Sequence, residues 1–416
     1  MSGNAEPYGK EGLPLEDARR RVLTAIQPIN SIITLPLHEA LGRVSASALR
    51  AAAAVPGFRA SVMDGYALGQ TSQPNIGDSW ELMGRSAAGQ PFDAALSSGE
   101  AIRILTGAPL PKGADWVLPQ ELVAVEGSTL RQVKEASDRA WIRPEDEECR
   151  PGDLLLAPGQ RLEAADLGRL ASCGIAELEL VAKPRIGLLI SGDELVPPGS
   201  SRHPGAIWES NGTLLDTMLR SLGQSVAQRR VVADQPEALR RSLQELATDC
   251  DVVVSTGGVS AGDTDWIRSL VDELGMVNFW KLFLRPGRPF AFGTIGDGVP
   301  FFGLPGNPVA AAITALQLLW PALQIQEGQS EPELFPRVKV TLADPLVRRP
   351  GRPELARARL EANEEGMLLA RVDGSQASSR IGSLQRADLL LELPPDAGSL
   401  DAGTRLWAQV IRRRIF

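Results

Sequence analysis

The most constraining feature of this sequence is a regular alternation of strand-sized and helix-sized segments between residues 185 and 323. Apolar, β-branched segments at 185–190, 225–232 and 251–255 are typical of buried strands, and helix-length segments follow them, beginning at Asn211, Pro236 and Thr264. Asn211 is expected to be the N-cap of the first helix, and Gly275 is expected to end the third. Further strands near 277–284, 290–295 and 300–304 precede a last helix at Asn307-Pro308. This alternation predicts a doubly wound, mainly parallel α/β sheet.

The rest of the chain lacks this alternation. Residues 1–178 contain one amphipathic helix near 15–26, an alanine-rich stretch at 46–54, and short strands interrupted by Gly and Pro. After residue 323, the pattern predicts strands at 337–342, 356–360, 367–372, 389–393 and 406–411. We therefore expect a multidomain protein: a central α/β domain, α+β and mostly-β units before it, and a small C-terminal β domain.

Charge and cysteine content exclude several classes of protein. A formal net charge of -8 disfavours binding to nucleic acid or to anionic membranes. The three cysteines are far apart in sequence and match neither a disulfide framework nor a zinc motif, so a reducing cytoplasm is expected. The most apolar late segment, 309–323, contains Thr314, Gln317 and Pro321, so no membrane span is expected.

Unusual loops follow the strands of the expected sheet, where doubly wound folds bind ligands. They are 191–194, 256–265 and 303–308, together with the basic hairpin 285–289. Glycines permit close approach of a ligand to the backbone, and free amides at helix starts can bind an anion. Each loop by itself could be only a tight turn. Their mixture of acidic residues with Lys281 and two arginines indicates a phosphorylated substrate and a hard divalent cation, whereas no P-loop or GxGxxG motif occurs.

Five ordered motifs extend over most of the chain. They are P-G-F-x-x-S-x-M-D-G-Y-A (56–67), T-G-A-P-x-P-x-G-A-D (106–115), S-G-D-E-L (191–195), T-G-G-V-S-x-G-D-x-D (256–265) and G-L-P-G-N-P-V (303–309). In this order they resemble the molybdopterin molybdenumtransferase family, which includes MoeA and the E domain of gephyrin. The segments 39–43 and 378–394 also resemble that family, so the likeness covers essentially the whole chain.

The resemblance implies an elongated homodimer with four parts per subunit. These are a discontinuous N-terminal dimerisation domain (1–50 and 142–178), an inserted domain (51–141), an α/β molybdopterin-binding domain (179–327) and a C-terminal β domain (328–416). The active cleft is expected between the α/β domain of one subunit and the inserted domain of the other. The implied reaction inserts molybdenum from molybdate into adenylylated molybdopterin and releases AMP, with Mg²⁺ or another divalent cation as cofactor. A molybdopterin adenylyltransferase is a possible partner.

The resemblance also assigns roles to individual residues. Asp64, Asp234 and Asp265 are the expected catalytic residues, and Glu194 and Asp265 the expected metal ligands. In isolation, Asp64 could be a turn residue, Asp234 a helix cap and Arg357 a solvated charge. The expected substrate-binding residues are Thr106, Arg143, Gly257, Gly258, Ser260, Lys281, Arg285, Arg288, Pro289, Pro305, Arg357 and Ser378.

Three positions depart from the family pattern. Arg285 and Arg288 replace the lysines of the usual K-P-G-K-P hairpin, which keeps the charge but exchanges an ammonium for a planar guanidinium. The usual R-P-x-G-x-D-I segment loses its glycine and carries Glu148 in place of Asp. Asp388 stands where the family has Asn, and is expected to be a turn residue with little effect.

Two alternatives to the transferase remain open. A scaffold or binding role is one, because gephyrin uses this domain for assembly. The expected carboxylates Asp64, Glu194 and Asp265 favour an enzyme, since a binder gains nothing from uncompensated acids near phosphates. The related molybdopterin adenylyltransferase is the other alternative, but it shares only the α/β domain.

Overall fold

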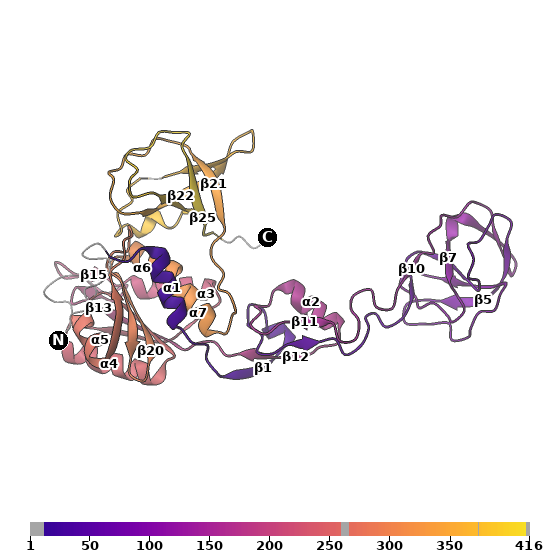
Figure 1. The fold of residues 1–416 in the computed structure, drawn as a ribbon, viewed down its shortest axis with the longest axis horizontal. Helices are drawn as coiled ribbons and strands as arrows, with labels where there is room; N and C mark the ends of the chain where they lie inside the picture. Colours follow the sequence, from indigo (N-terminus) through magenta and orange to yellow (C-terminus); the bar gives the residue numbers. More distant parts are fainter. Residues whose placement is uncertain (1–11, 259–265, 373, 413–416) are drawn as a thin grey trace.

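The structure is a computed structural model that describes residues 12–258, 266–372 and 374–412 of the chain. The molecule is elongated, with the α/β domain and the C-terminal barrel at one end and the inserted domain at the other (Figure 1). Thin two-stranded ladders connect the two ends. The expected multidomain architecture is therefore confirmed.

The central sheet has six strands in the order β16-β13-β17-β20-β19-β18. The first four run parallel, whereas β18 and β19 are antiparallel additions at one edge. The strands are β13 (Ile186–Ser191), β16 (Val226–Val232), β17 (Val252–Thr256), β18 (Gly275–Trp280), β19 (Ala291–Ile295) and β20 (Val299–Leu304). This arrangement confirms the prediction of a mainly parallel α/β sheet.

Helices cover both faces of this sheet, so it is doubly wound (Figure 1). Leu188 and Val254 face a core that includes α3, α6 and α7, whereas Leu189 and Val253 face a core with α4 and α5. Successive side chains of each strand point to opposite faces of the sheet. Both sets are apolar here, as expected for parallel strands that are buried on both faces. The helices are α3 (Asn211–Ser221), α4 (Pro236–Asp249), α5 (Trp266–Leu274), α6 (Pro308–Thr314), the π-helical η3 (Ala315–Leu319) and α7 (Trp320–Gln326).

One predicted helix cap differs from the structure, whereas the predicted end of the third helix is confirmed. Asn211 is the first residue of α3 and not its cap; the Gly212 N–H donates to the Glu209 carboxylate instead, at 2.7 Å. Helix α5 ends at Leu274, just before Gly275 as predicted, and Gly275 begins β18, where a Cβ would lie only 2.0 Å from the Thr294 carbonyl oxygen. Strand pairing explains this glycine, because the partner strand approaches too closely for a side chain.

Helix α1 (Leu15–Ala25) packs on the α/β domain and not on the two-stranded ladders, which follow it in the chain (Figure 1). Pro321 has no N–H and cannot donate to the Gln317 carbonyl one turn earlier. Arg19 of α1 supplies the missing donor, with Nε 3.1 Å from that carbonyl oxygen and Nη2 2.8 Å from the Gln317 side-chain oxygen. The proline in the core helix therefore creates the docking point for α1.

The discontinuous domain consists of short antiparallel ladders and one helix. Strand β1 (Ile32–Pro36) pairs with β12 (Glu177–Val181), and β2 (Leu49–Arg50) pairs with β11 (Leu154–Leu156). A short 3-10 turn, η1 (Leu37–Glu39), follows β1, and helix α2 (Ala164–Ser172) starts with a reciprocal capping box between Glu163 and Asp166. Both chain connections to the inserted domain leave from these ladders, which sets the distance between the two ends of the molecule.

The inserted domain has a six-stranded mixed sheet in the order β7-β4-β6-β5-β9-β8. A ladder of β3 and β10 lies at its base. The elements are β3 (Ala60–Ser61), β4 (Gly65–Leu68), β5 (Ser79–Ser86), β6 (Glu100–Ile104), β7 (Trp116–Pro119), η2 (Gln120–Leu122), β8 (Val123–Glu126), β9 (Thr129–Gln132) and β10 (Ile142–Arg143).

The C-terminal domain is a closed barrel of five strands, as the expected β domain required. Leu355 and Leu390 join the core of the α/β domain and so attach the barrel to it. The strands are β21 (Arg337–Leu342), β22 (Glu354–Ala362), β23 (Leu368–Arg371), β24 (Leu389–Leu393) and β25 (Arg405–Val410), with a 3-10 turn η4 (Ile381–Ser383).

One helical segment among the described residues, Pro308–Gln326, is long and apolar enough to cross a membrane by length and composition. Its apolar window is 89% buried inside the protein, as in the core helix of a globular domain.

Candidate functional site

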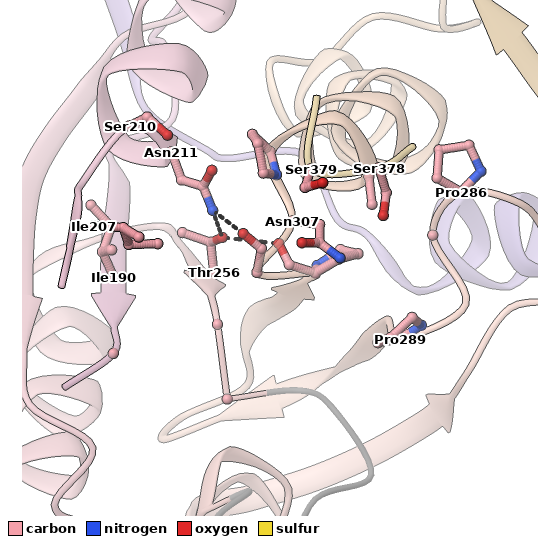
Figure 2. Close-up of a pocket in the computed structure, with 18 of the residues that line it drawn as sticks. Ile190, Ile207, Ser210, Asn211, Thr256, Pro286, Pro289, Asn307, Ser378 and Ser379 are labelled. Carbon is pink, nitrogen blue, oxygen red and sulfur yellow. Dashed lines mark hydrogen bonds between the residues drawn. The ribbon is translucent and has the colours of Figure 1, made fainter. Parts of the chain in front are cut away.

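A cavity of about 1000 Å³ lies beyond the carboxyl ends of the parallel strands (Figure 2). The loops after β13, β17 and β20 line it, together with the hairpin 285–289 and the barrel loop 376–379. Many of the residues singled out in the sequence line this cavity: Glu194, Asp234, Gly257, Gly258, Arg285, Arg288, Pro289, Pro305 and Ser378. Ser260, Asp263 and Asp265 lie outside the described residues.

Two consecutive glycines shape the floor of this strand-end cavity. Gly257 has φ +92° and Gly258 has φ +61°, in the left-handed region that favours glycine. A Cβ at Gly257 would lie 2.4 Å from the Ser191 carbonyl oxygen, and one at Gly258 would lie 2.7 Å from the Ile267 side chain. Both positions therefore need glycine for conformation and for space.

The side chain of Asn211 connects two of the cavity loops. Its Nδ2 donates to Thr256 Oγ1 at 2.8 Å and to the Gly306 carbonyl at 2.7 Å, while the Thr256 hydroxyl donates to the Pro305 carbonyl at 3.0 Å. Figure 2 shows these bonds as a chain across the cavity wall. They fix the loop before α6 relative to the end of β17. The sequence prediction of an N-cap missed this role.

Carboxylates gather at one side of the cavity. Burial raises the pKa of Asp234, the nearby Ser191 hydroxyl opposes that shift, and the charges of Asp193 and Glu194 raise the pKa further. Asp193 also accepts a hydrogen bond from the Asp234 N–H at 2.9 Å, so it orients this loop. Neighbouring acids that repel one another, here the half-buried Asp234 beside the exposed Asp193 and Glu194, are suited to a cation.

No group of three or more His, Cys, Asp or Glu side chains that could hold a metal ion occurs among the described residues. Mg²⁺ commonly takes one or two carboxylates together with substrate phosphates and water. Glu194 and Asp234, which line the cavity, provide carboxylates of that kind.

Guanidinium groups gather at the hairpin side. Arg285, Arg288 and Arg352 line the cavity, and the pKa of Arg352 is lowered by burial and by the charges of the other two. Arg285 Nη1 lies 3.7 Å from Glu354, which is buried. Glu354 is thus one carboxylate partner of the hairpin among the described residues. Concentrated positive charge in a cavity favours an anionic ligand.

Two expected substrate residues of the α/β domain and the barrel, among those that the structure describes, do not line this cavity. Lys281 precedes the hairpin with φ +90°, and its backbone pairs with Leu13 and Phe290. Arg357 is 2% exposed and lies behind the barrel loop, where its Nε donates to Ser383 Oγ at 3.1 Å and its Nη2 to the Ala377 carbonyl at 3.2 Å. Arg357 therefore holds the loop that carries Ser378.

The inserted domain brings together a second set of predicted residues. Asp64 Oδ1 accepts hydrogen bonds from the Thr106 N–H at 2.7 Å and from the Thr106 hydroxyl at 2.8 Å. These two bonds lower the pKa of Asp64. Arg143, on β10 beside β3, pairs with Glu147 at 2.7 Å. In Figure 1 this domain is at the far end of the chain from the strand-end cavity, so one chain does not bring Asp64 and Glu194 together.

The two other departures from the family pattern have structural partners. Glu148 accepts a hydrogen bond from Arg169 of α2 at 2.8 Å, which ties the connection from the inserted domain to the discontinuous domain. Asp388 accepts from the Leu360 N–H at 3.1 Å and pairs with Arg412 at 3.0 Å. Asp388 is therefore more than a turn residue.

Sequence reasoning missed Trp208, which lines the cavity and is 47% exposed. Its indole N–H donates to the Ser200 carbonyl at 2.9 Å, and the Arg202 guanidinium lies 4.1 Å from its ring centroid. In the sequence, the signal for this role was an aromatic residue close after the Gly/Pro-rich segment 197–205. A ring held in this way offers a flat surface for a planar heterocycle.

Family comparisons cover nearly all of the chain. Residues 13–174 match the MoeA N-terminal region (domain I and II). Residues 187–325 match a probable molybdopterin binding domain, and residues 339–410 match the MoeA C-terminal region (domain IV).

Curated relatives and solved structures agree with these matches. The chain is 32% identical to a molybdopterin molybdenumtransferase of Haemophilus influenzae over 94% of this chain and 96% of that protein. It is 29% identical to gephyrin of Dictyostelium discoideum, over 96% of this chain and 62% of gephyrin. A crystal structure of the molybdopterin biosynthesis moeA protein from Pyrococcus horikoshii OT3 matches 96% of this chain and 100% of its own, with a TM-score of 0.80 and 25% identity. This chain therefore belongs to the molybdopterin molybdenumtransferase family.

Proposed function

We propose that the chain inserts molybdenum from molybdate into adenylylated molybdopterin and releases AMP. The observation that carries this proposal is the strand-end cavity, which is lined by three arginines, by the carboxylates of Glu194 and Asp234, and by glycine-rich loops. An oxyanion and a phosphoanhydride both need such positive charge and free amides. Family membership makes this use of the cavity the best-supported one.

The chemistry divides between the two sides of the cavity. The two dithiolene thiols bind molybdenum through sulfur, and their two protons leave with one oxygen of molybdate as a single water molecule, without a change in oxidation state. Cleavage of the adenylate adds a water-derived oxygen to phosphorus and frees AMP. Arg285, Arg288 and Arg352 would bind the oxyanion, and the Gly257–Gly258 backbone would approach the phosphates.

A divalent cation, Mg²⁺ in our proposal, fits the carboxylate side. Glu194 and Asp234 would hold it together with phosphate oxygens of the substrate. When bound, such a cation neutralises charge on the phosphoanhydride. Because the pKa of Asp234 is raised, a larger fraction of it is protonated at mildly acidic pH, and cation affinity should increase as pH rises through that pKa.

We further propose that the working form is a homodimer whose cleft combines both ends of the subunit. The inserted domain, with Asp64 and Thr106, lies far from the strand-end cavity of its own chain (Figure 1). A second copy arranged antiparallel along the long axis, related by a two-fold axis, could supply these residues to both clefts. The cytoplasm suits the three free cysteines, and a molybdopterin adenylyltransferase would supply the substrate.

The test is reconstitution with defined components. Purified protein is incubated with adenylylated molybdopterin, Mg²⁺ and molybdate, and both AMP and active molybdenum cofactor are measured. AMP release and cofactor formation that both depend on Mg²⁺ and on the protein are expected. Binding of the adenylylated substrate without release of AMP would instead support a binding or scaffold role.

A further inference from the structure

Two of the three cysteines meet in the discontinuous domain. The Cys149 Sγ lies 3.6 Å from the Cys173 Sγ, although the two residues are 24 positions apart in the chain. Both are free thiols, whereas the third cysteine, Cys250, is buried in the core of the α/β domain. Sulfur atoms at this separation touch, but those of a disulfide are ~2.0 Å apart. The two cysteines are therefore a contacting pair of thiols that is not bonded.

Two separate segments hold the sulfur atoms together. Cys173 is the C-cap of α2, and its N–H donates to the Arg169 carbonyl at 3.1 Å. Gly174, with φ +78°, ends the helix directly after it. Cys149 lies in the connection that returns from the inserted domain, with its thiol 3.8 Å from the Ala53 carbonyl. The backbone of each segment therefore fixes its cysteine in the contact.

Cys149 lies where the two connections to the inserted domain run side by side. The Val55 N–H donates to the Cys149 carbonyl at 3.1 Å, and the Glu148 N–H donates to the Val55 carbonyl at 3.0 Å. Val55 belongs to the outgoing connection and Cys149 to the returning one, and the two form an antiparallel bridge. A covalent bond from Cys149 to the end of α2 would therefore fasten both connections to the discontinuous domain.

The two thiols differ in their access to solvent. Cys149 is 2% exposed, whereas Cys173 is partly exposed. Burial raises the pKa of the Cys149 thiol, and Cys173 raises it further; the charge of Arg169 opposes this shift and that of Asp153 adds to it. Cys173 is thus the thiol that a reagent in solution meets first, and Cys149 is held in contact behind it.

We propose that Cys149 and Cys173 form a site of thiol–disulfide exchange with small-molecule disulfides of the glutathione type. Cys173 loses its proton and attacks one sulfur of the reagent, which leaves a mixed disulfide on Cys173 and releases one thiolate. Cys149 loses its proton and attacks the Cys173 sulfur, which releases the second thiolate. Each leaving thiolate takes up one proton. One reagent disulfide and two cysteine thiols thus become one protein disulfide and two reagent thiols, and excess thiol reverses the reaction.

This site goes beyond the proposed transferase reaction, because neither of these two described cysteines lines the strand-end cavity. The disulfide would close the segment 149–173 into a loop and attach the base of the inserted domain to α2. A cross-link of this kind restricts the unfolded chain and so stabilises the folded one. The oxidised protein should therefore unfold at a higher urea concentration than the reduced protein.

Mapping of thiols in the full chain tests the proposal. The protein is equilibrated with mixtures of oxidised and reduced glutathione, quenched with acid, unfolded and alkylated, and its peptides are identified by mass spectrometry without reduction. A peptide pair joining Cys149 to Cys173 should accumulate as the oxidised fraction rises, in chains that remain monomeric on a denaturing gel, while Cys250 is alkylated. Dithiothreitol should remove the link. Alkylation of both cysteines in every mixture, or a link only between chains, would overturn the proposal.

Single variants separate this pair from ordinary cysteine oxidation. Cys250→Ala removes the cysteine outside the pair and should keep both the link and the higher urea midpoint of the oxidised protein. Cys173→Ser and Cys149→Ser should lose both. In Cys173→Ser, Cys149 should form a mixed disulfide with glutathione at least about tenfold more slowly than Cys173 does in Cys149→Ser, because burial hinders attack. Equal rates would contradict the order of attack, and equal urea midpoints of oxidised and reduced Cys250→Ala would contradict the fastening of the base.

Discussion

At the scale of single residues, hydrogen bonds and burial shift the pKa values of two predicted carboxylates in opposite directions. Asp64 is exposed, yet two donors from Thr106 lower its pKa, whereas burial and neighbouring acids raise the pKa of Asp234. The two carboxylates therefore differ in how readily they bind a proton, although both are expected to be catalytic. Their environments fit Asp64 as a permanent anion and Asp234 as the group that exchanges a proton for a cation.

Thr106→Val should shift the acid limb of the pH–activity profile to higher pH. The change removes the hydroxyl donor, so the pKa of Asp64 rises toward its ordinary value and the carboxylate is protonated at a higher pH. Thr106→Ser keeps the hydroxyl and should retain the wild-type profile. The limb is measured from initial rates of cofactor formation between pH 4 and 8. An unshifted limb would mean that Asp64 does not limit activity at low pH.

Arg288→Ala should raise the molybdate concentration that gives half-maximal cofactor formation, by about tenfold for a lost bidentate contact worth ~1.5 kcal/mol. Release of AMP without molybdate should change little. Arg241→Ala, at an exposed position of α4, removes the same charge outside the cavity and is the control. If both variants saturate with molybdate like the wild type, the hairpin does not bind the oxyanion.

At the scale of elements, one proline determines how the N-terminal helix packs. The pattern of 15–26 predicts the helix, and the structure has it as α1 (Leu15–Ala25). No local signal shows that Arg19 replaces the backbone donor missing at Pro321, because the two residues are about 300 positions apart. The helix can be predicted from the pattern of its own residues, whereas the residue against which it packs cannot.

Arg19→Ala should lower the free energy of unfolding by about 1–3 kcal/mol, because it leaves the buried Gln317 carbonyl without a donor. Arg20→Ala, one residue further along α1, removes an exposed pair with Asp17 and should cost less than about 0.5 kcal/mol. Urea unfolding followed by circular dichroism measures both. Equal losses in the two variants would show that the buried contact contributes nothing beyond an ordinary surface arginine.

At the scale of the whole molecule, elongation separates two sets of predicted residues. Asp64 and Thr106 lie in the inserted domain, and Glu194 and Asp234 lie at the strand-end cavity at the other end (Figure 1). No motion within the α/β domain would close that separation. A complete site from both sets therefore requires two chains.

Subunit mixing tests this requirement. Asp64→Ala and Glu194→Ala chains are each expected to be inactive, and their equimolar mixture after subunit exchange should recover about a quarter of wild-type activity, since half of the dimers are mixed and each has one intact cleft of two. A mixture of Glu194→Ala with Asp234→Ala, both at the strand-end cavity, should recover none, because every cleft then lacks one of these carboxylates. Exchange is verified by mass spectrometry with one chain isotope-labelled. No recovery in the first mixture would place each site within one chain.

The sequence by itself determined the α/β domain, the family and most of the strand-end cavity. Strand and helix periods, helix caps and glycine-rich loops are local, and the carboxyl ends of parallel strands always meet at one edge of a sheet. Knowledge of the sheet order was therefore not needed to group Glu194, Gly257 and Pro305.

Only the tertiary structure decided which side of a loop a residue faces and which distant groups meet. It placed Arg357 behind the loop that carries Ser378, and gave Asn211 a bond across the cavity wall in place of a cap. It also brought the sulfur atoms of Cys149 and Cys173 to 3.6 Å, although their spacing in the sequence suggested no relation. These outcomes depend on packing between segments far apart in the chain. Several groups could pair with a given donor or charge, and burial in the folded protein selects among them, not proximity in the sequence.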